Sequence, residues 1–191
     1  MKQLGWWLGV VATGLVLGVG SAGVVLWLGQ SSGAVAVGPW TTNVTFGSTS
    51  ADMYTRTRVA LVALFANNSS ETLYYRATSD SDGAPLSGDC SYLLEGTDLP
   101  ARWWSIAAYG PDNFLIANEA NVYSRSRSTV EREANGHFVI RVSSAKQDGD
   151  WLPVKAGESF DLTARLYNPD ASVSADPASA ALPRIVRESC R

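Results

Sequence analysis

The feature that most constrains the fold of this chain is an uncharged run at residues 4–28, close to its N-terminus. As an α-helix this run would be about 38 Å long, because each helical residue adds about 1.5 Å. The hydrocarbon core of a bilayer is about 30 Å thick, so such a helix is long enough to cross it with some tilt. We therefore interpret residues 1–30 as an N-terminal transmembrane anchor.

A cleaved secretory signal is the alternative interpretation of the same segment. The sequence Ala-Val-Ala at residues 34–36 resembles the small-residue motif that precedes signal cleavage, so a cut would follow Ala36. The apolar core of a signal is usually about 7–15 residues long, and the present run is longer. Its length favours an anchor that is retained.

The charges around the run predict its orientation. Lys2 precedes it, and the next charged residue is Asp52. Since positive charge tends to remain on the cytoplasmic side, we expect the N-terminus in the cytoplasm and the rest of the chain outside. Tryptophans stand near both ends of the run, as in an aromatic belt: Trp6, Trp7, Trp27 and Trp40.

Small residues recur every four positions within the run. Gly14, Gly18 and Ala22 fall on one face of a helix. Because small residues at this spacing let two helix backbones approach closely, this face is a candidate contact with another membrane protein. Glycine is also common in membrane helices in general, so the alternative is a pattern without a partner.

Composition limits the class of partner. The chain has 191 residues and a net charge of −3, with no basic run after the anchor. Nucleic acids are bound largely through Lys and Arg contacts with phosphates, so we expect no nucleic-acid partner. The part after the anchor is long enough for one domain with its own core.

The two cysteines, Cys90 and Cys190, predict a disulfide. A domain exported across the membrane lies in an oxidising compartment, where two cysteines most simply pair with each other. Two free thiols or an intermolecular bond are the alternatives. A bridge would fix a C-terminal tail that otherwise has little pattern of its own.

The residues after the anchor predict a β domain. Gly, Ser and Thr make residues 31–49 a linker, with at most a short strand at 43–46. One amphipathic helix is expected at residues 50–67, with Ser50 as its N-cap. Short strands separated by turn residues follow at 71–79, 92–94, 102–109, 114–116, 121–128, 137–143 and 160–167.

This pattern predicts a mainly β fold over residues 50–191. The number of short strands favours an antiparallel β-sandwich or jelly-roll-like domain with one packed helix, in addition to the transmembrane helix. Residues 168–181 are rich in Pro, Ala, Ser and Asp and predict an irregular, extended C-terminal tail.

Several motifs in this part resemble domain-of-unknown-function family 1214. They lie in register over about residues 50–187, and the most specific are Leu-Pro-Ala-Arg-Trp-Trp-Ser-Ile at 99–106, Asp-Trp-Leu-Pro at 150–153 and Leu-Thr-Ala-Arg-Leu-Tyr-Asn-Pro at 162–169. The resemblance implies a bacterial β-sandwich without established catalytic residues. It also implies that Cys90 replaces a polar residue, frequently His. The family's frequent companion, family 1254, is not expected here, where the anchor takes its place.

Few residues are candidates for chemistry. His137 is the single histidine, whereas a zinc site needs three or four ligands, so we expect no metal and no cofactor. The acidic residues of 80–98 are candidates for acid–base work or a hard cation, but Asp is also an ordinary turn residue. This acidic segment contains Asp80, Asp82, Asp89, Glu95 and Asp98.

Two further groups are candidates for binding. Arg102, Trp103 and Trp104 would suit a sugar or lipid, although a double Trp inside a strand is also typical of a core. A basic group would suit an anion or form a solvated face, and it consists of Arg125, Arg127 and Arg132.

The sequence thus predicts a single-pass protein of the bacterial inner membrane with a periplasmic domain. We expect a non-enzymatic accessory or interaction subunit of a membrane complex, without catalytic residues. A binding module for a small amphipathic or glycan ligand is the first alternative. A hydrolase-like enzyme of unknown class, using the carboxylates of 80–98, is the second.

Overall fold

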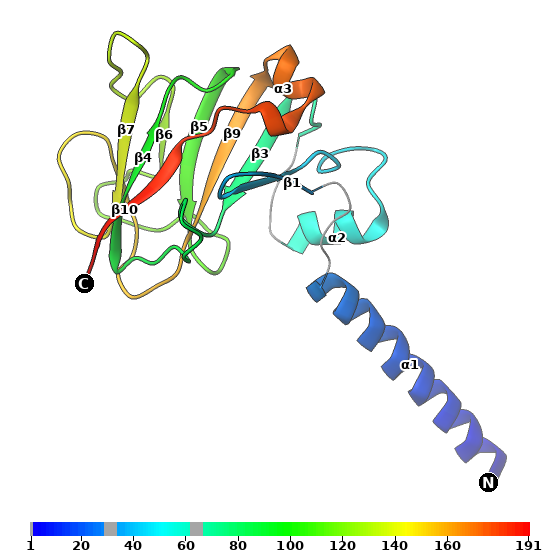
Figure 1. The fold of residues 1–191 in the computed structure, drawn as a ribbon. Coiled ribbons are helices and arrows are strands. Elements are labelled where there is room, and N and C mark those ends of the chain that lie inside the picture. The colour runs from blue at the N-terminus through cyan, green and yellow to red at the C-terminus, as the bar shows by residue number, and fades with distance from the viewer. Residues whose placement is uncertain (1, 29–33, 62–66) are drawn as a thin grey trace.

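The computed structural model describes residues 2–28, 34–61 and 67–191. A long apolar helix stands apart from a β domain (Figure 1). The elements in chain order are α1 (Lys2–Leu28), β1 (Ala34–Val37), β2 (Trp40–Asn43), α2 (Met53–Leu61), β3 (Thr72–Ala77), β4 (Cys90–Gly96), β5 (Ala101–Tyr109), β6 (Ser124–Ser126), β7 (Phe138–Ser143), β8 (Trp151–Pro153), β9 (Asp161–Pro169), α3 (Ala171–Ala175), the 3-10 turn η1 (Pro177–Ser179) and β10 (Arg184–Cys190).

Helix α1 is long and apolar enough over Gln3–Leu26 to cross a membrane, and no residue in this stretch is buried against the rest of the protein. Gly14 and Gly18 face open space, since a methyl group added at either would meet no atom within 4 Å. An apolar surface of this size is unfavourable in water. The helix is therefore built to be covered by something other than the β domain.

The strands form two sheets. The larger has six strands in the order β1-β2-β3-β9-β5-β6, and the smaller has four in the order β10-β4-β7-β8. All the paired strands are antiparallel except β7 and β8, so the smaller sheet is mixed. This arrangement confirms the prediction of a mainly β fold, with a parallel pair at one edge that the sequence did not indicate.

The hydrophobic core lies between the two sheets. Leu162, Ala164 and Leu166 of β9 are fully buried, as their alternation in the sequence predicted. They share one cluster with residues of the smaller sheet, among them Leu94 and Ile140. Face-to-face packing of this kind is that of a β-sandwich.

Residues 34–43 form a hairpin within the segment that we expected to be a linker. β1 pairs with β2, and β2 pairs with β3, so the larger sheet begins at Ala34. Trp40 is buried in the domain, where its indole Nε1 donates to the carbonyl of Pro183 at 2.8 Å. It therefore cannot belong to an aromatic belt at the membrane. The side chain of Trp27 and residues 29–33 lie outside the described residues.

Helix α2 begins later than predicted. Asp52, not Ser50, is its cap: the carboxylate accepts hydrogen bonds from the backbone N–H groups of Tyr54 and Thr55 at 2.8 and 3.0 Å. An aspartate at this position satisfies N–H groups that have no helical partner. Residues 62–66, where the sequence predicted the rest of the helix, lie outside the described residues.

The C-terminal tail ends in a strand, β10, which the sequence did not predict. β10 pairs with β4 over most of its length, and Cys190 lies opposite Cys90. The two cysteines form a disulfide, with their Cα atoms 4.0 Å apart, which confirms the predicted pairing. Residues 168–181, predicted to be irregular or extended, contain the end of β9, the short helix α3 and the turn η1.

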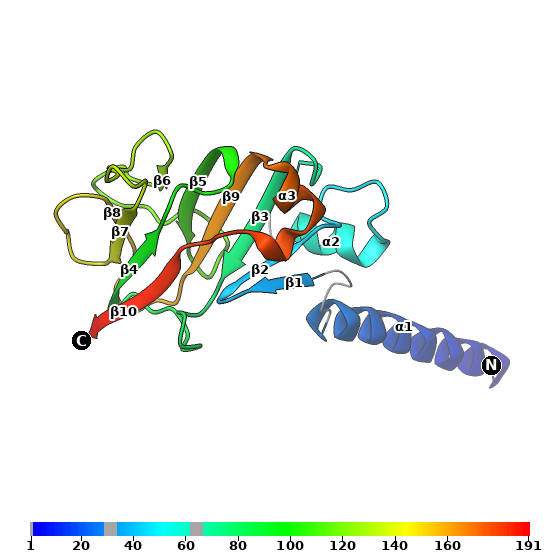
Figure 2. The ribbon, with the colours of Figure 1, turned by 45° about the horizontal axis from the view of Figure 1, so that its top comes forward.

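Three other strand predictions need correction. Residues 114–116 are not a strand and make only an isolated bridge between Tyr109 and Leu115. The strand expected at 121–128 is reduced to β6 (Ser124–Ser126), and β8 was not predicted. Figure 2 shows β7 and β8 on the side of the domain away from α1, and β1 and α2 on the side near it.

Candidate functional site

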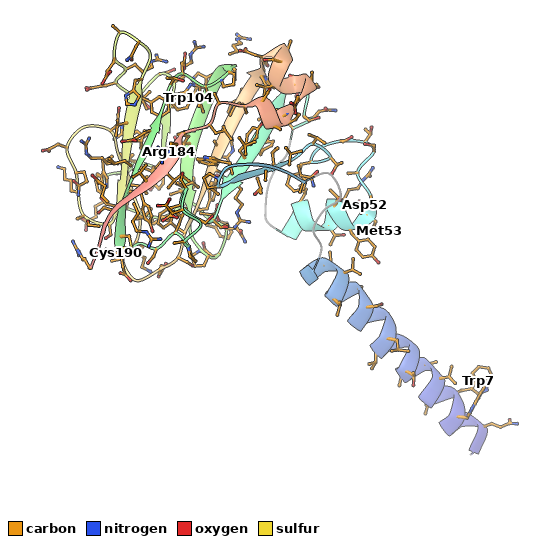
Figure 3. The ribbon with its side chains drawn as sticks, in the orientation of Figure 1. Trp7, Asp52, Met53, Trp104, Arg184 and Cys190 are labelled. Carbon is orange, nitrogen blue, oxygen red and sulfur yellow. A yellow bond between two sulfur atoms is a disulfide. The ribbon has the colours of Figure 1, made fainter. Side chains whose placement is uncertain are left out.

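Trp104 is a core residue and not a ligand-binding one. Its ring is fully buried and stacks on Phe138 of the opposite sheet, with centroids 5.0 Å apart and an interplanar angle of 29°. Its indole Nε1 donates to Asp98 Oδ1 at 2.7 Å. Figure 3 shows Trp104 within the sandwich. The prediction that this residue binds a ligand is therefore wrong.

Trp103 lies on the opposite face of β5, because neighbouring residues of a strand point to opposite sides. It is 37% exposed and packs against Tyr167 of β9, with ring centroids 5.2 Å apart. Its Nε1 donates to Ser128 Oγ at 3.0 Å. Arg102 is exposed beside it, and its carbonyl accepts from Arg127. Of the three predicted ligand residues, two are thus on the surface.

The outer face of the larger sheet carries further aromatic residues that sequence reasoning missed. The guanidinium of Arg165 lies over the rings of Tyr74, at 5.9 Å, and Tyr109, at 5.3 Å, and donates to the Tyr109 hydroxyl at 2.5 Å. Cation–π contacts of this kind stabilise an arginine on an aromatic surface. We call this surface the open aromatic face, made of Tyr74, Trp103, Tyr109, Arg165 and Tyr167.

The register of the strands assembles the open aromatic face. Tyr74 of β3 lies opposite Arg165 of β9, and Trp103 of β5 lies opposite Tyr167. Each side chain alternates with a buried neighbour, and this period of two is visible in the sequence. The sequence does not show which strands are adjacent, so the grouping could not be found from the pattern alone.

Asp98 holds together the loops beside Trp104. Besides the indole N–H, its carboxylate pairs with Arg127 at 2.8 Å and with Arg132 at 3.2 Å. Burial alone would raise its pKa, but hydrogen bonds from Trp104 and Arg127, together with the two positive charges, outweigh this effect and hold the pKa below its usual value. Asp98 therefore acts as a structural anion.

This pKa shift predicts a dependence of stability on pH. A carboxylate with a lowered pKa in the folded state stabilises the fold above its ordinary pKa of 3.8, and this contribution is lost as the pH falls through the lowered value. We expect Asp98→Asn to lower the free energy of unfolding most at neutral pH, with a difference from wild type that shrinks below pH 3.8.

Urea unfolding of the full-length protein in detergent at several pH values measures this difference. Asp148→Asn, which removes an exposed carboxylate in the loop between β7 and β8, controls for the change in net charge. A difference between wild type and Asp98→Asn that stays constant from neutral to acid pH would contradict the assignment.

The predicted basic group is occupied by carboxylates. Arg127 and Arg132 bind Asp98, and Arg125 lies 3.6 Å from Asp150. An arginine whose charge is already paired with a carboxylate binds a further anion less strongly. These residues therefore do not make an anion site of their own.

The acidic residues of 80–98 do not converge either. Asp80 is buried, pairs with Arg187 at 2.8 Å and accepts from the N–H groups of Asp82 and Ala84 in a turn. Asp89 accepts from the N–H of Gly157. Hydrogen bonds to the chain's own backbone are the ordinary use of Asp in turns. Asp80, Asp89 and Asp98 thus have separate structural partners.

Among the residues that the structure describes, neither His137 nor another potential metal ligand forms a metal-binding site. His137 Nδ1 lies 3.8 Å from Glu133 at the start of β7. Over the described ranges, no group of three His, Cys, Asp or Glu side chains is placed to hold a metal ion. The open aromatic face therefore remains the principal candidate surface of the β domain.

The comparison with protein families decides what kind of domain this is. The family model of DUF1214, a protein family of unknown function, matches residues 71–171, which is more than half of the chain. The chain belongs to the DUF1214 family. The DUF1214 match runs from just before β3 to the start of α3, so it contains Asp98, Trp103 and Trp104 but not α1, the β1–β2 hairpin or β10.

One solved structure has a similar fold. The VPA0106 protein from Vibrio parahaemolyticus is similar with a TM-score of 0.61 and 22% identity, over 73% of this chain and 36% of the Vibrio chain. An uncharacterised protein from Burkholderia cenocepacia is similar with a TM-score of 0.37 and 14% identity, over 61% of this chain and 28% of its own. The comparison with curated proteins gave no match. The Vibrio similarity supports the fold and carries no activity across.

Proposed function

We propose that this DUF1214 protein is a single-pass protein of the bacterial inner membrane that serves as a non-enzymatic accessory or interaction subunit of a membrane complex. Its N-terminus lies in the cytoplasm and its β domain in the periplasm. The observation that carries the proposal is the direct attachment of the apolar helix α1 to the first strand of the sandwich. Only residues 29–33 separate α1 from β1.

The β1–β2 hairpin supports retention of the anchor. Cleavage after Ala36 would cut inside β1, whose residues Ala34–Val37 pair with β2. The edge of the larger sheet would then lose a paired strand.

Two features support the periplasmic side for the domain. Lys2 is the one charged side chain before the apolar run, and positive charge favours the cytoplasm. The Cys90–Cys190 disulfide fits an oxidising compartment, and the periplasm is one. Both point to the same topology.

The roles of the polar residues support a function without catalysis. Asp80 and Asp98, which the sequence offered for acid–base chemistry, hold turns and arginines within the fold. No observation favours the hydrolase-like alternative. We propose no cofactor and no nucleic-acid partner.

The partner contact is proposed on the face of α1 formed by Gly14, Gly18 and Ala22. At Gly14 and Gly18 this face is open for a second helix backbone. We expect Gly18→Leu to abolish most of the recovery of a membrane partner, because the new side chain would hold the two backbones apart. Gly20→Leu is the matched control, since residue 20 lies about 200° around the helix and also faces open space.

The measurement is extraction of the full-length protein from its native membrane in mild detergent, followed by mass spectrometry of the proteins recovered with it. A stoichiometric membrane protein that is lost in Gly18→Leu but kept in Gly20→Leu supports the proposal. A protein that runs as a lone monomer and recovers nothing contradicts it. The N-terminal mass in the same sample reports whether residues 1–36 are retained.

A second candidate function is a binding module for a small amphipathic or glycan ligand. The half-exposed contact between the rings of Trp103 and Tyr167, with Arg165 beside it, favours this function, because sugars and apolar rings pack on exposed aromatic surfaces. Native mass spectrometry of the full-length protein tests it. A bound small molecule that is absent from Trp103→Ala supports this candidate, and bare protein in both samples contradicts it.

A further inference from the structure

We propose that the start of α2 enters the lipid–water interface beside the end of α1, with Met53 and Tyr54 as the inserted side chains. The β domain would then rest on the membrane surface in one orientation, and would not swing freely on its anchor. This inference rests on the proposed function, since it requires α1 to be retained in the bilayer.

The first observation is the position of α2. It contacts α1, and Figures 1 and 2 both show it beside the C-terminal end of that helix. A helix that crosses a bilayer leaves the hydrocarbon core near its end. The start of α2 is therefore held at the height of the lipid headgroups.

The second observation is the exposure of two adjacent large side chains. Met53 is 81% exposed and Tyr54 is 50% exposed, although both are largely apolar. Figure 3 shows Met53 at the start of α2, on the side of that helix toward α1 in this view. The place of these two exposed side chains beside α1, which is proposed to leave the bilayer here, points to lipid as the occupant.

The chemistry of these residues suits a lipid interface. Tyrosine has an apolar ring with a polar hydroxyl, and such side chains are enriched where a membrane meets water. Methionine is flexible and adapts to an irregular apolar surface. The Asp52 cap fixes the direction of both side chains, because it anchors the N–H group of Tyr54 at the first turn of α2.

The charges near α2 do not oppose this placement. The sequence has no charged residue from position 3 to position 51, so the residues directly before Asp52 bring no charge to the interface. Arg56 of α2 is exposed, and its guanidinium donates to the carbonyls of Ala51 and Thr49. An exposed guanidinium at this height is attracted by anionic lipid headgroups.

Site-directed spin labelling of the full-length protein tests the proposal. The native cysteines are bonded to each other, so a single added cysteine can be labelled selectively. The variants are Met53→Cys, Val16→Cys in the middle of α1, and Lys146→Cys in the loop between β7 and β8. This loop is exposed and lies on the side of the domain away from α1 (Figure 2).

Each labelled protein is placed in nanodiscs of phosphatidylethanolamine and phosphatidylglycerol, with one protein per disc. Collision rates with oxygen, which concentrates in lipid, and with a water-soluble nickel complex are then measured. We expect Val16 to be reached mainly by oxygen and Lys146 mainly by nickel. At Met53 we expect a several-fold lower nickel rate than at Lys146, together with a raised oxygen rate.

The other outcomes overturn the proposal in distinguishable ways. If Met53 is as open to nickel as Lys146 while Val16 is in lipid, the anchor stands and the docking of α2 is wrong. If Met53 is shielded from both reagents, protein covers it and not lipid. If Val16 is open to nickel, the anchor itself is not in the membrane, and the proposed function fails together with this inference.

Discussion

Loss of the Cys90–Cys190 disulfide is expected to lower the free energy of unfolding of the β domain by about 4–5 kcal/mol. The bond joins residues 100 positions apart, so it removes much of the conformational freedom of the unfolded chain. In the folded state it joins the end of β10 to the start of β4. Without it, β10 is held by its hydrogen bonds to β4 and to Ser81 and by the burial of Ile185 in the core.

The measurement is urea unfolding of the full-length protein in detergent, followed by tryptophan fluorescence, for wild type and for the double variant Cys90→Ser, Cys190→Ser. Ser189→Ala, a change next to Cys190 in the same strand, is the matched control and should cost less than about 0.5 kcal/mol. Equal unfolding midpoints for wild type and the double variant would show that β10 does not depend on the bond. Reduction of the wild-type protein should reproduce the loss.

The disulfide could be predicted from the sequence, whereas the strand that contains Cys190 could not. Two cysteines in an exported domain leave few pairings. β10, by contrast, reads Arg-Ile-Val-Arg-Glu-Ser-Cys and lacks a clean alternation, because it lies at the edge of the smaller sheet and is exposed along much of its length. Its structure depends on β4, almost 100 residues earlier in the chain, and such long-range pairing leaves no local pattern.

The hairpin of residues 34–43 was missed for a related reason. Its strands are four residues each, and its Gly, Ser and Thr neighbours are typical of a linker. Trp40 was the available signal, because a large aromatic residue in a polar segment needs a place to be buried. β9 was predicted correctly because Leu162, Ala164 and Leu166 alternate with polar residues over its full length.

Within the candidate site, one pair of residues shows the same limit of prediction from local sequence patterns. Trp103 and Trp104 are identical in type and adjacent, so composition cannot distinguish them. The alternation of side chains along a strand places them on opposite faces of the sheet. Which of the two faces the core depends on the register in which the strand pairs with its neighbours. The structure assigns Trp104 to the core and Trp103 to the open aromatic face, which changes what each substitution should do.

Trp104→Ala is accordingly expected to cost about 3–5 kcal/mol of unfolding free energy, whereas Trp103→Ala should cost less than about 1 kcal/mol. The first change opens a cavity against Phe138 and removes the indole donor to Asp98. The second removes a side chain that is partly in water and packs on Tyr167.

Thermal or urea unfolding of the full-length protein in detergent measures both losses of unfolding free energy. Trp104→Phe separates the contribution of packing by Trp104 from that of its hydrogen bond. Phenylalanine keeps much of the packing on Phe138 but cannot donate to Asp98, so it should lose less than alanine while leaving Asp98 with its arginines. If Trp103→Ala costs as much as Trp104→Ala, the outer ring is structural and the open aromatic face is not available to a ligand. If Trp103→Ala is nearly neutral, Trp103 is free to serve binding, because the fold does not require it.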